Sequence, residues 1–187
     1  AVVLAVPSGV AAQLLAAVDQ PLAQELAGIQ YAGSAIVSLG FSQSDVQHPL
    51  DAAGLVVART AGRKILAISF SSSKFPARAP LGAVLLRAFV GGALDPTTAL
   101  LDDSRLQSLV IAEVSALLGI RVPPQFVQID RWAGAMPQYH VGHVQRIERI
   151  NHRLAGIAGV ALAGAAYEGV GIPQVIASGQ AAAARLV

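Results

Sequence analysis

The C-terminal stretch, residues 160–186, constrains the fold of this chain more than any other segment. It begins with the apolar run VALA, which is followed by Gly164 and is typical of a short buried strand that ends in a tight turn. Pro173 is a natural first residue of a helix, and the alanine-rich run that follows continues this helix. The segment therefore predicts a strand, a glycine-containing turn and a helix, in that order.

The turn before this helix has the composition of an anion-binding site. Gly169 and Gly171 flank Val170, and glycine allows unusual backbone dihedrals or a close approach to a ligand. The N-terminal end of a helix carries unpaired N–H groups and a partial positive charge, which favour a phosphate, a carboxylate or a developing negative charge. Strand–turn–helix units also use glycines without binding any ligand, so this pattern alone leaves both interpretations open.

Composition excludes several classes of protein. The net charge is +2 and only 13% of residues are charged, so the chain lacks the basic surface expected of a nucleic-acid-binding protein. It has no cysteine, which excludes disulfides, thiolate metal sites and a cysteine nucleophile, and is consistent with a cytoplasmic protein. We find no membrane span or signal peptide in the sequence. Because the chain opens on the apolar run AVVLAVP without an initiator Met, we expect it to be part of a longer protein.

The middle of the chain predicts a mainly antiparallel sheet covered by a helix. Asp102 is a good N-cap residue, and Gly119 ends the amphipathic helical pattern that follows it. At the N-terminus, residues 1–6 are continuously apolar and predict a central parallel strand covered on both faces. Further strands are expected over 31–41, 54–60, 64–73, 83–90 and 126–132, and further helices over 10–18, 21–26 and 141–154.

Two conventional kinds of catalytic site have little support in the sequence. His140 and His143 form an HxxH pair, and Glu148 and His152 lie four residues apart, but the spacing lacks a known metal-binding pattern, so we predict no metal. A serine hydrolase would need a nucleophile turn such as GxSxG, which does not occur. The serines in 69–73 lie in a strand-like run and are expected to be sheet or turn residues.

Three stretches, RWAGAMPQYHVGH (131–143), SFSSSKFPARAP (69–80) and AGAAYEGVGIPQVIASG (163–179), resemble the C-terminal half of the oxygen-dependent porphyrinogen oxidases of haem synthesis. These are flavoproteins of the amine-oxidase-like superfamily. The resemblance implies an α/β and α+β architecture, with part of a split FAD-binding α/β domain and a substrate domain of mainly antiparallel sheet covered by helices. The implied domains are 1–9 and 123–187 for FAD and 10–122 for the substrate. The N-terminal GxGxxG motif that binds the flavin diphosphate is missing.

The resemblance also implies residues that contact each ligand. Lys74 and Arg78 are implied to bind the substrate; the alternative is that they form a charged sheet edge, which discourages aggregation. Phe89 is implied to contact the substrate and Trp132 the flavin; the alternative for both is ordinary packing in a core. The substrate-binding residues implied are Lys74, Arg78 and Phe89, and the FAD-binding residues implied are Trp132, Met136, Pro137, Gly164, Gly169, Val170, Gly171 and Ile172.

The function implied is the FAD-dependent oxidation of a porphyrinogen to a porphyrin, with oxygen as electron acceptor and no catalytic side chain required. Coproporphyrinogen III carries four propionates and protoporphyrinogen IX two, so the basic residues Lys74, Arg78 and Arg87 favour the former. The alternatives are another oxidoreductase of the amine-oxidase-like superfamily and a non-catalytic porphyrin-binding relative. Oligomeric state and peripheral membrane contact are left open by the sequence.

Overall fold

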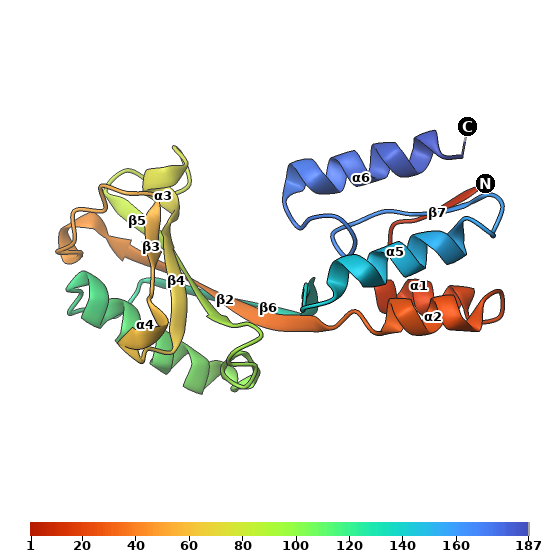
Figure 1. Cartoon of the computed structure of the whole chain (residues 1–187). Coiled ribbons are helices and arrows are strands. Elements are labelled where there is room, and N and C mark those ends of the chain that lie inside the picture. The colour runs from red at the N-terminus through yellow and green to blue at the C-terminus, as the bar shows by residue number, and fades with distance from the viewer. Residues whose placement is uncertain (187) are drawn as a thin grey trace. The chain divides into compact units, whose positions relative to one another are not determined.

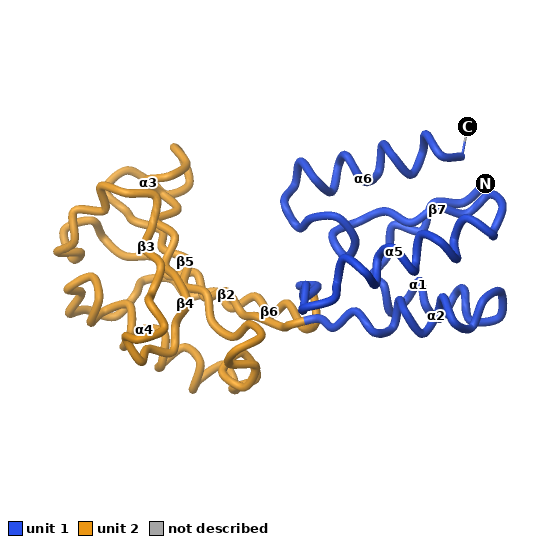
Figure 2. Tube along the Cα trace, viewed as in Figure 1, with its two compact units in different colours: residues 1–31, 136–187 blue, residues 32–135 orange. Residues whose placement is uncertain are grey.

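The computed structural model describes residues 1–186, which form two compact units (Figure 1). Unit 1 comprises residues 1–31 and 136–187, and unit 2 comprises residues 32–135 (Figure 2). The chain passes from unit 1 to unit 2 near the start of strand β2 (Tyr31–Ser42) and returns near the end of strand β6 (Phe126–Pro137). Each unit is described by itself below.

Unit 2 is built on a five-stranded sheet with the order β3-β4-β5-β2-β6. The pairs β3–β4, β4–β5 and β2–β5 are all antiparallel. Strands β2 and β5 alternate buried and half-exposed residues, because each strand places every second side chain on the same face. This alternation is typical of an antiparallel sheet with one face packed on a core. The predicted antiparallel sheet is confirmed. Its other strands are β3 (Gly54–Val56), β4 (Ile65–Phe70) and β5 (Ala83–Gly91).

Helix α4 (Asp103–Leu118) covers one face of this sheet and closes the core of unit 2. The Asp102 carboxylate accepts a hydrogen bond from the Arg105 N–H at 2.9 Å, which caps the helix as predicted. Gly119 ends the helix in a left-handed conformation, with φ of 68°. The buried face of α4 consists of Leu106, Val110, Val114 and Leu118, and it packs against alternate residues of β2, β4 and β5.

The segment between β3 and β5 differs from the strands predicted over 54–60 and 64–73 in two respects. The two strands form an antiparallel pair, but β3 has only three residues, and the connection to β4 contains a 3-10 helix (Arg59–Ala61). The serine run was predicted as strand; instead β4 ends at Phe70, and Ser71–Lys74 forms the short helix α3. The Ser72 hydroxyl accepts a hydrogen bond from the Leu85 N–H at 3.1 Å, so this serine binds the backbone of β5 rather than extending β4.

Unit 1 contains a two-stranded parallel sheet, β1 (Val2–Leu4) with β7 (Val160–Leu162), and four helices within the described residues. The parallel pairing agrees with the apolar composition of both strands. The prediction that the first strand is covered on both faces is wrong for the described chain, because Val2 is 53% exposed. The helices are α1 (Ser8–Leu15), α2 (Gln20–Ala27), α5 (His143–Leu154) and α6 (Ile172–Ala184).

The core of unit 1 lies between β7 and the helices α1, α2 and α5, with Leu22, Leu26 and Ile150 almost completely buried. In contrast, α6 buries only Ala182. The compact units divide at 31/32 and 135/136, whereas the predicted domains divide at 9/10 and 122/123. The difference arises because α1 and α2 pack with α5 in unit 1, and because most of β6 pairs within the sheet of unit 2.

Candidate functional site

The loop between β7 and α6 holds most of the predicted flavin-binding residues. The backbone at Gly164 has φ of 132° and that at Gly169 has φ of 151°, conformations that residues with a side chain rarely adopt. Gly171 is the N-cap residue of α6, and within residues 1–186 no side chain caps this helix end. The residues on either side of Gly171, Val170 and Ile172, are 64% and 77% exposed. The loop therefore presents a glycine-lined helix N-terminus between two exposed apolar side chains.

Gly169 and Gly171 both lie close to the side chain of Gln174, and the packing is more restrictive at Gly169. A Cβ at Gly169 would lie 2.7 Å from the Cβ of Gln174, and a Cβ at Gly171 would contact the Gln174 side-chain oxygen. The Gly164 N–H donates a hydrogen bond to the Ser178 hydroxyl at 3.1 Å, which joins the start of the loop to α6. This arrangement could bind an anionic or electron-rich group at the end of α6, because the helix dipole and the free N–H groups favour negative charge there.

Two aromatic side chains hold the same loop: Tyr139, which lies between β6 and α5, and His143, the first residue of α5. The Tyr139 hydroxyl donates a hydrogen bond to the Ala165 carbonyl oxygen at 2.6 Å and accepts one from the Gly169 N–H at 2.8 Å. The Tyr139 ring stacks on the His143 ring, with centroids 3.9 Å apart. Burial raises the pKa of Tyr139, although the Gly169 N–H acts in the opposite direction, so the hydroxyl keeps its proton at neutral pH. The HxxH pattern indicated His143 only as a candidate metal ligand, and no local signal in the sequence singled out Tyr139.

The remaining predicted flavin residues lie on β6, which is longer than predicted. Trp132 is in the part of β6 that belongs to unit 2, whereas Met136 and Pro137 belong to unit 1, as does the loop before α6. The alternative for Trp132, ordinary packing in a core, does not hold for the described chain, because its side chain is 53% exposed. An exposed aromatic side chain on a strand is available for contact with a ligand or with another part of the protein.

The predicted substrate-binding residues all lie in unit 2 and occur next to aromatic rings. The Lys74 ammonium lies 5.2 Å from the centre of the Phe75 ring, and the Arg78 guanidinium lies 5.7 Å from it. The Arg87 guanidinium lies 5.8 Å from the centre of the Phe89 ring. These distances are typical of cation–π pairs, which hold a cation in place while leaving it able to bind an anion.

Phe89 lies on β5 between Ile36 of β2 and Ala67 of β4. Its neighbours in sequence, Ala88 and Val90, are buried in the core with α4, so Phe89 points to the opposite face of the sheet, where it is half-buried. Helix α3, which ends at Lys74, is joined to β5 by the bond between Ser72 and Leu85. Unit 2 thus carries the three predicted substrate residues on one strand and on the short helix and loop that precede it.

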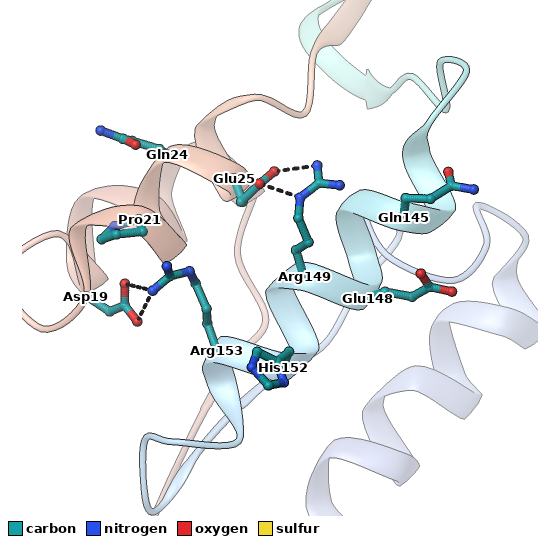
Figure 3. A pocket seen from close by; sticks show the side chains of 9 residues that line it. All are labelled: Asp19, Pro21, Gln24, Glu25, Gln145, Glu148, Arg149, His152 and Arg153. Atoms are coloured by element: carbon teal, nitrogen blue, oxygen red, sulfur yellow. Dashed lines mark hydrogen bonds and ion pairs between the residues drawn. The ribbon is translucent and has the colours of Figure 1, made fainter.

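A groove of about 1050 Å³ lies between α2 and α5 in unit 1 (Figure 3). Glu25 accepts hydrogen bonds from Arg149 at 2.5 and 3.0 Å and from Arg146 at 3.2 Å, and Asp19 pairs with Arg153 at 3.2 Å. The hydrogen bond from Arg149 is the main cause of the lowered pKa of Glu25. Each of the three arginines is paired with a carboxylate, so we interpret this groove as an ion-paired junction between helices.

Neither a metal cluster nor a membrane helix is found in the part of the chain that the structure describes. Residues 1–186 contain no group of three or more histidines and carboxylates placed to bind a metal ion. Among the same residues, no helix is both long enough and apolar enough to cross a bilayer.

The fold is shared with flavin-dependent oxidoreductases. A crystal structure from Exiguobacterium sp. 255-15, which carries the provisional name protoporphyrinogen oxidase, superimposes with a TM-score of 0.82 at 33% sequence identity, over 96% of this chain and 39% of that one. The predicted fold class is therefore confirmed.

Sequence comparison identifies the family. The profile of the flavin containing amine oxidoreductases matches residues 1–187, and the chain belongs to this family. It is similar to coproporphyrinogen III oxidase of Bacillus subtilis, with 36% identity over 97% of this chain and 38% of the relative. It is 31% identical to protoporphyrinogen oxidase of Bos taurus, over the whole of this chain and 40% of the relative. These findings confirm the resemblance and the flavin cofactor. The chain spans about two fifths of the length of these relatives.

Proposed function

We propose that the full-length protein is an FAD-dependent oxidase that converts a porphyrinogen to a porphyrin, with oxygen as electron acceptor, and that it prefers coproporphyrinogen III to protoporphyrinogen IX. The observation that carries the proposal is the uncapped N-terminus of α6 behind a glycine loop, in a chain of the flavin-containing family. The higher identity to the bacterial coproporphyrinogen III oxidase than to the bovine protoporphyrinogen oxidase supports the substrate preference.

The residues at the start of α6 fit a flavin ring. Gly171 leaves the backbone accessible, and the exposed side chains of Val170 and Ile172 offer an apolar surface on either side. We place the flavin ring against this loop, with Gly164, Gly169, Met136 and Pro137 of the same unit as further contacts. A contact of the flavin with Trp132, which lies in unit 2, stays a prediction from the resemblance. When bound, the flavin accepts hydride equivalents from the substrate and passes the electrons to oxygen. The N-terminus of α6 stabilises the negative charge that reduction builds, and no side-chain base is required.

The cation–π pairs of unit 2 fit a substrate that carries carboxylates. We assign to Lys74 and Arg78 charge-assisted hydrogen bonds to propionates, and to Phe89 packing against the tetrapyrrole. The contacts of both cations with the Phe75 ring support the assignment. Four propionates offer more partners to these cations than two do, which again favours coproporphyrinogen III. A cytoplasmic location, the use of oxygen and any peripheral contact with a membrane remain predictions.

Turnover by the full-length protein tests the proposal. We expect porphyrin fluorescence to rise in air with either substrate, and faster with coproporphyrinogen III. The variant Lys74→Met should raise the KM for coproporphyrinogen III about tenfold, because a hydrogen bond to a charged group contributes roughly 1.5 to 3 kcal/mol. Arg121→Met, which removes an exposed cation elsewhere in unit 2, is the matched control. Failure with both substrates while FAD is bound would exclude a porphyrinogen oxidase and leave another oxidoreductase of the superfamily or a non-catalytic relative.

A separate expectation concerns FAD binding by the 187-residue chain. The chain lacks GxGxxG, so these residues should not retain FAD after desalting, whereas the full-length protein should. A yellow protein after desalting of the isolated chain would contradict the assignment of its glycines to the ring of the flavin rather than to the diphosphate.

A further inference from the structure

Three backbone groups of the loop before α6 are held by side chains that come from a distant part of the sequence. Tyr139 contacts the Ala165 carbonyl oxygen and the Gly169 N–H, and His143 lies with its Nε2 atom 3.3 Å from the Tyr167 carbonyl oxygen. Burial of Ala166 and Tyr167 in the core of unit 1 and the bond from Gly164 to Ser178 hold other parts of the loop. The backbone at Ala165 and Gly169 is held by the Tyr139 hydroxyl.

His143 fixes the position of Tyr139. The two rings are nearly parallel, with an interplanar angle of 12°, and His143 is buried at the first turn of α5. Because a carbonyl oxygen can only accept, a hydrogen bond to Tyr167 requires the proton on Nε2. That bond and the stacked contact together orient the imidazole, and the imidazole in turn supports the phenol ring from one side.

The tyrosine hydroxyl is suited to both bonds at once. It donates to a carbonyl oxygen and accepts from an N–H group, which phenylalanine cannot do and which an ionised phenolate could do only in part. The raised pKa keeps the phenol protonated. Gly169 is two residues before the N-cap of α6, so fixing its N–H also fixes the backbone that leads into the helix N-terminus.

We propose that Tyr139, supported by His143, is a positioning residue for the flavin site: its hydroxyl holds the Gly169 N–H and thereby sets the backbone of residues 169–172 against the flavin ring. This inference rests on the proposed function, because it assigns that backbone to the flavin. Tyr139 need not touch the cofactor. It acts by removing alternative conformations of the loop, so that the N-terminus of α6 is already oriented when the reduced flavin forms.

The test uses the FAD-loaded full-length protein and the variant Tyr139→Phe, which keeps the stacked ring and loses both hydrogen bonds. We expect exchange of the Gly169 amide hydrogen to accelerate about tenfold or more, the reduction potential of the bound flavin to fall, and kcat to fall about tenfold with little change in KM. If the role of Tyr139 is purely structural, Tyr139→Phe will accelerate exchange of the Gly169 amide hydrogen but leave the flavin reduction potential and kcat/KM unchanged. That result would overturn the proposal. Unchanged exchange would also overturn it.

A matched control is Tyr31→Phe. Tyr31 is in the same unit and packs against the same core as Tyr167, but its hydroxyl accepts a hydrogen bond from the Ser8 N–H of α1 at 2.9 Å. This variant should leave the flavin potential unchanged. An equal shift in both tyrosine variants would mean that the effect is general to the unit and would refute a specific role for Tyr139.

A second variant keeps the test decisive if Tyr139→Phe does not fold. His143→Phe preserves a stacked aromatic ring but loses the bond to Tyr167, so the potential should shift in the same direction by a smaller amount. No shift in this variant would count against the proposal. Failure of the underlying function is distinguishable in the wild-type full-length protein, which would then either contain no flavin or contain FAD and oxidise neither porphyrinogen.

Discussion

The substitution Gly169→Ala should destabilise the loop before α6 strongly, whereas Gly171→Ala should not. Both glycines neighbour Gln174, but their surroundings differ in two ways. Gly169 has φ of 151°, and a new Cβ there would lie 2.7 Å from the Cβ of Gln174, an atom fixed to the helix backbone. Gly171 has φ of −72°, and a new Cβ there would meet only the flexible end of the Gln174 side chain.

The magnitude follows from these two costs. A residue other than glycine in this region of backbone dihedrals costs about 1 to 3 kcal/mol, and the contact with the Gln174 Cβ requires the helix start to shift. We therefore expect about 2 to 3 kcal/mol for Gly169→Ala. For Gly171→Ala we expect less than about 0.5 kcal/mol, because the Gln174 amide can rotate away.

Native-state hydrogen exchange of the α6 amides measures this difference directly. The free energy of local opening should fall in Gly169→Ala and stay near the wild-type value in Gly171→Ala. The reasoning is refuted if both variants behave alike, or if Gly169→Ala is as protected as the wild type. Either result would mean that the loop adopts a different backbone conformation at Gly169.

Three further predictions concern stability. Leu106→Ala removes a completely buried side chain of α4 and should lower the free energy of unfolding of unit 2 by about 2 to 5 kcal/mol in urea titrations; a smaller loss would mean that α4 does not close the core. Asp102→Ala removes the cap of the same helix and should cost about 1 kcal/mol in the same assay, with no loss expected if the cap is absent. Glu25→Gln should cost roughly 1 kcal/mol at neutral pH. Because the pKa of Glu25 is lowered, the stabilisation is present above its ordinary value of 4.5 and is lost as the pH falls through the lowered folded value, so wild type and Glu25→Gln should converge in acid.

Local sequence signals predicted the elements whose ends and partners lie close together in the chain. Helix α4 has a capping aspartate at one end and a glycine at the other, and its apolar residues recur at helical spacing. The strand, glycine loop and helix at 160–186 form one contiguous unit, so composition alone was enough to predict their order. The predicted start of α6 differs by only one residue, because Ile172 precedes Pro173 in the first turn.

Long-range contacts account for most of the features that were missed. Strand β6 continues to Pro137 alongside β2, which is about a hundred residues away in the chain, so nothing near Trp132 indicates that the strand goes on. The serines after β4 form α3 and do not extend the strand, because the Ser72 hydroxyl accepts a hydrogen bond from the Leu85 N–H of β5. The contact of Tyr139 with Gly169 joins positions thirty residues apart. The sequence connected them only because both lie in stretches that resemble the porphyrinogen oxidases.

Anaerobic mixing of the full-length protein with coproporphyrinogen III tests the central claim most directly. The account predicts that the absorbance of the oxidised flavin bleaches on mixing, returns when air is admitted, and is accompanied by porphyrin fluorescence. A protein that contains FAD but stays fully oxidised with both coproporphyrinogen III and protoporphyrinogen IX would contradict the claim that this fold oxidises a porphyrinogen.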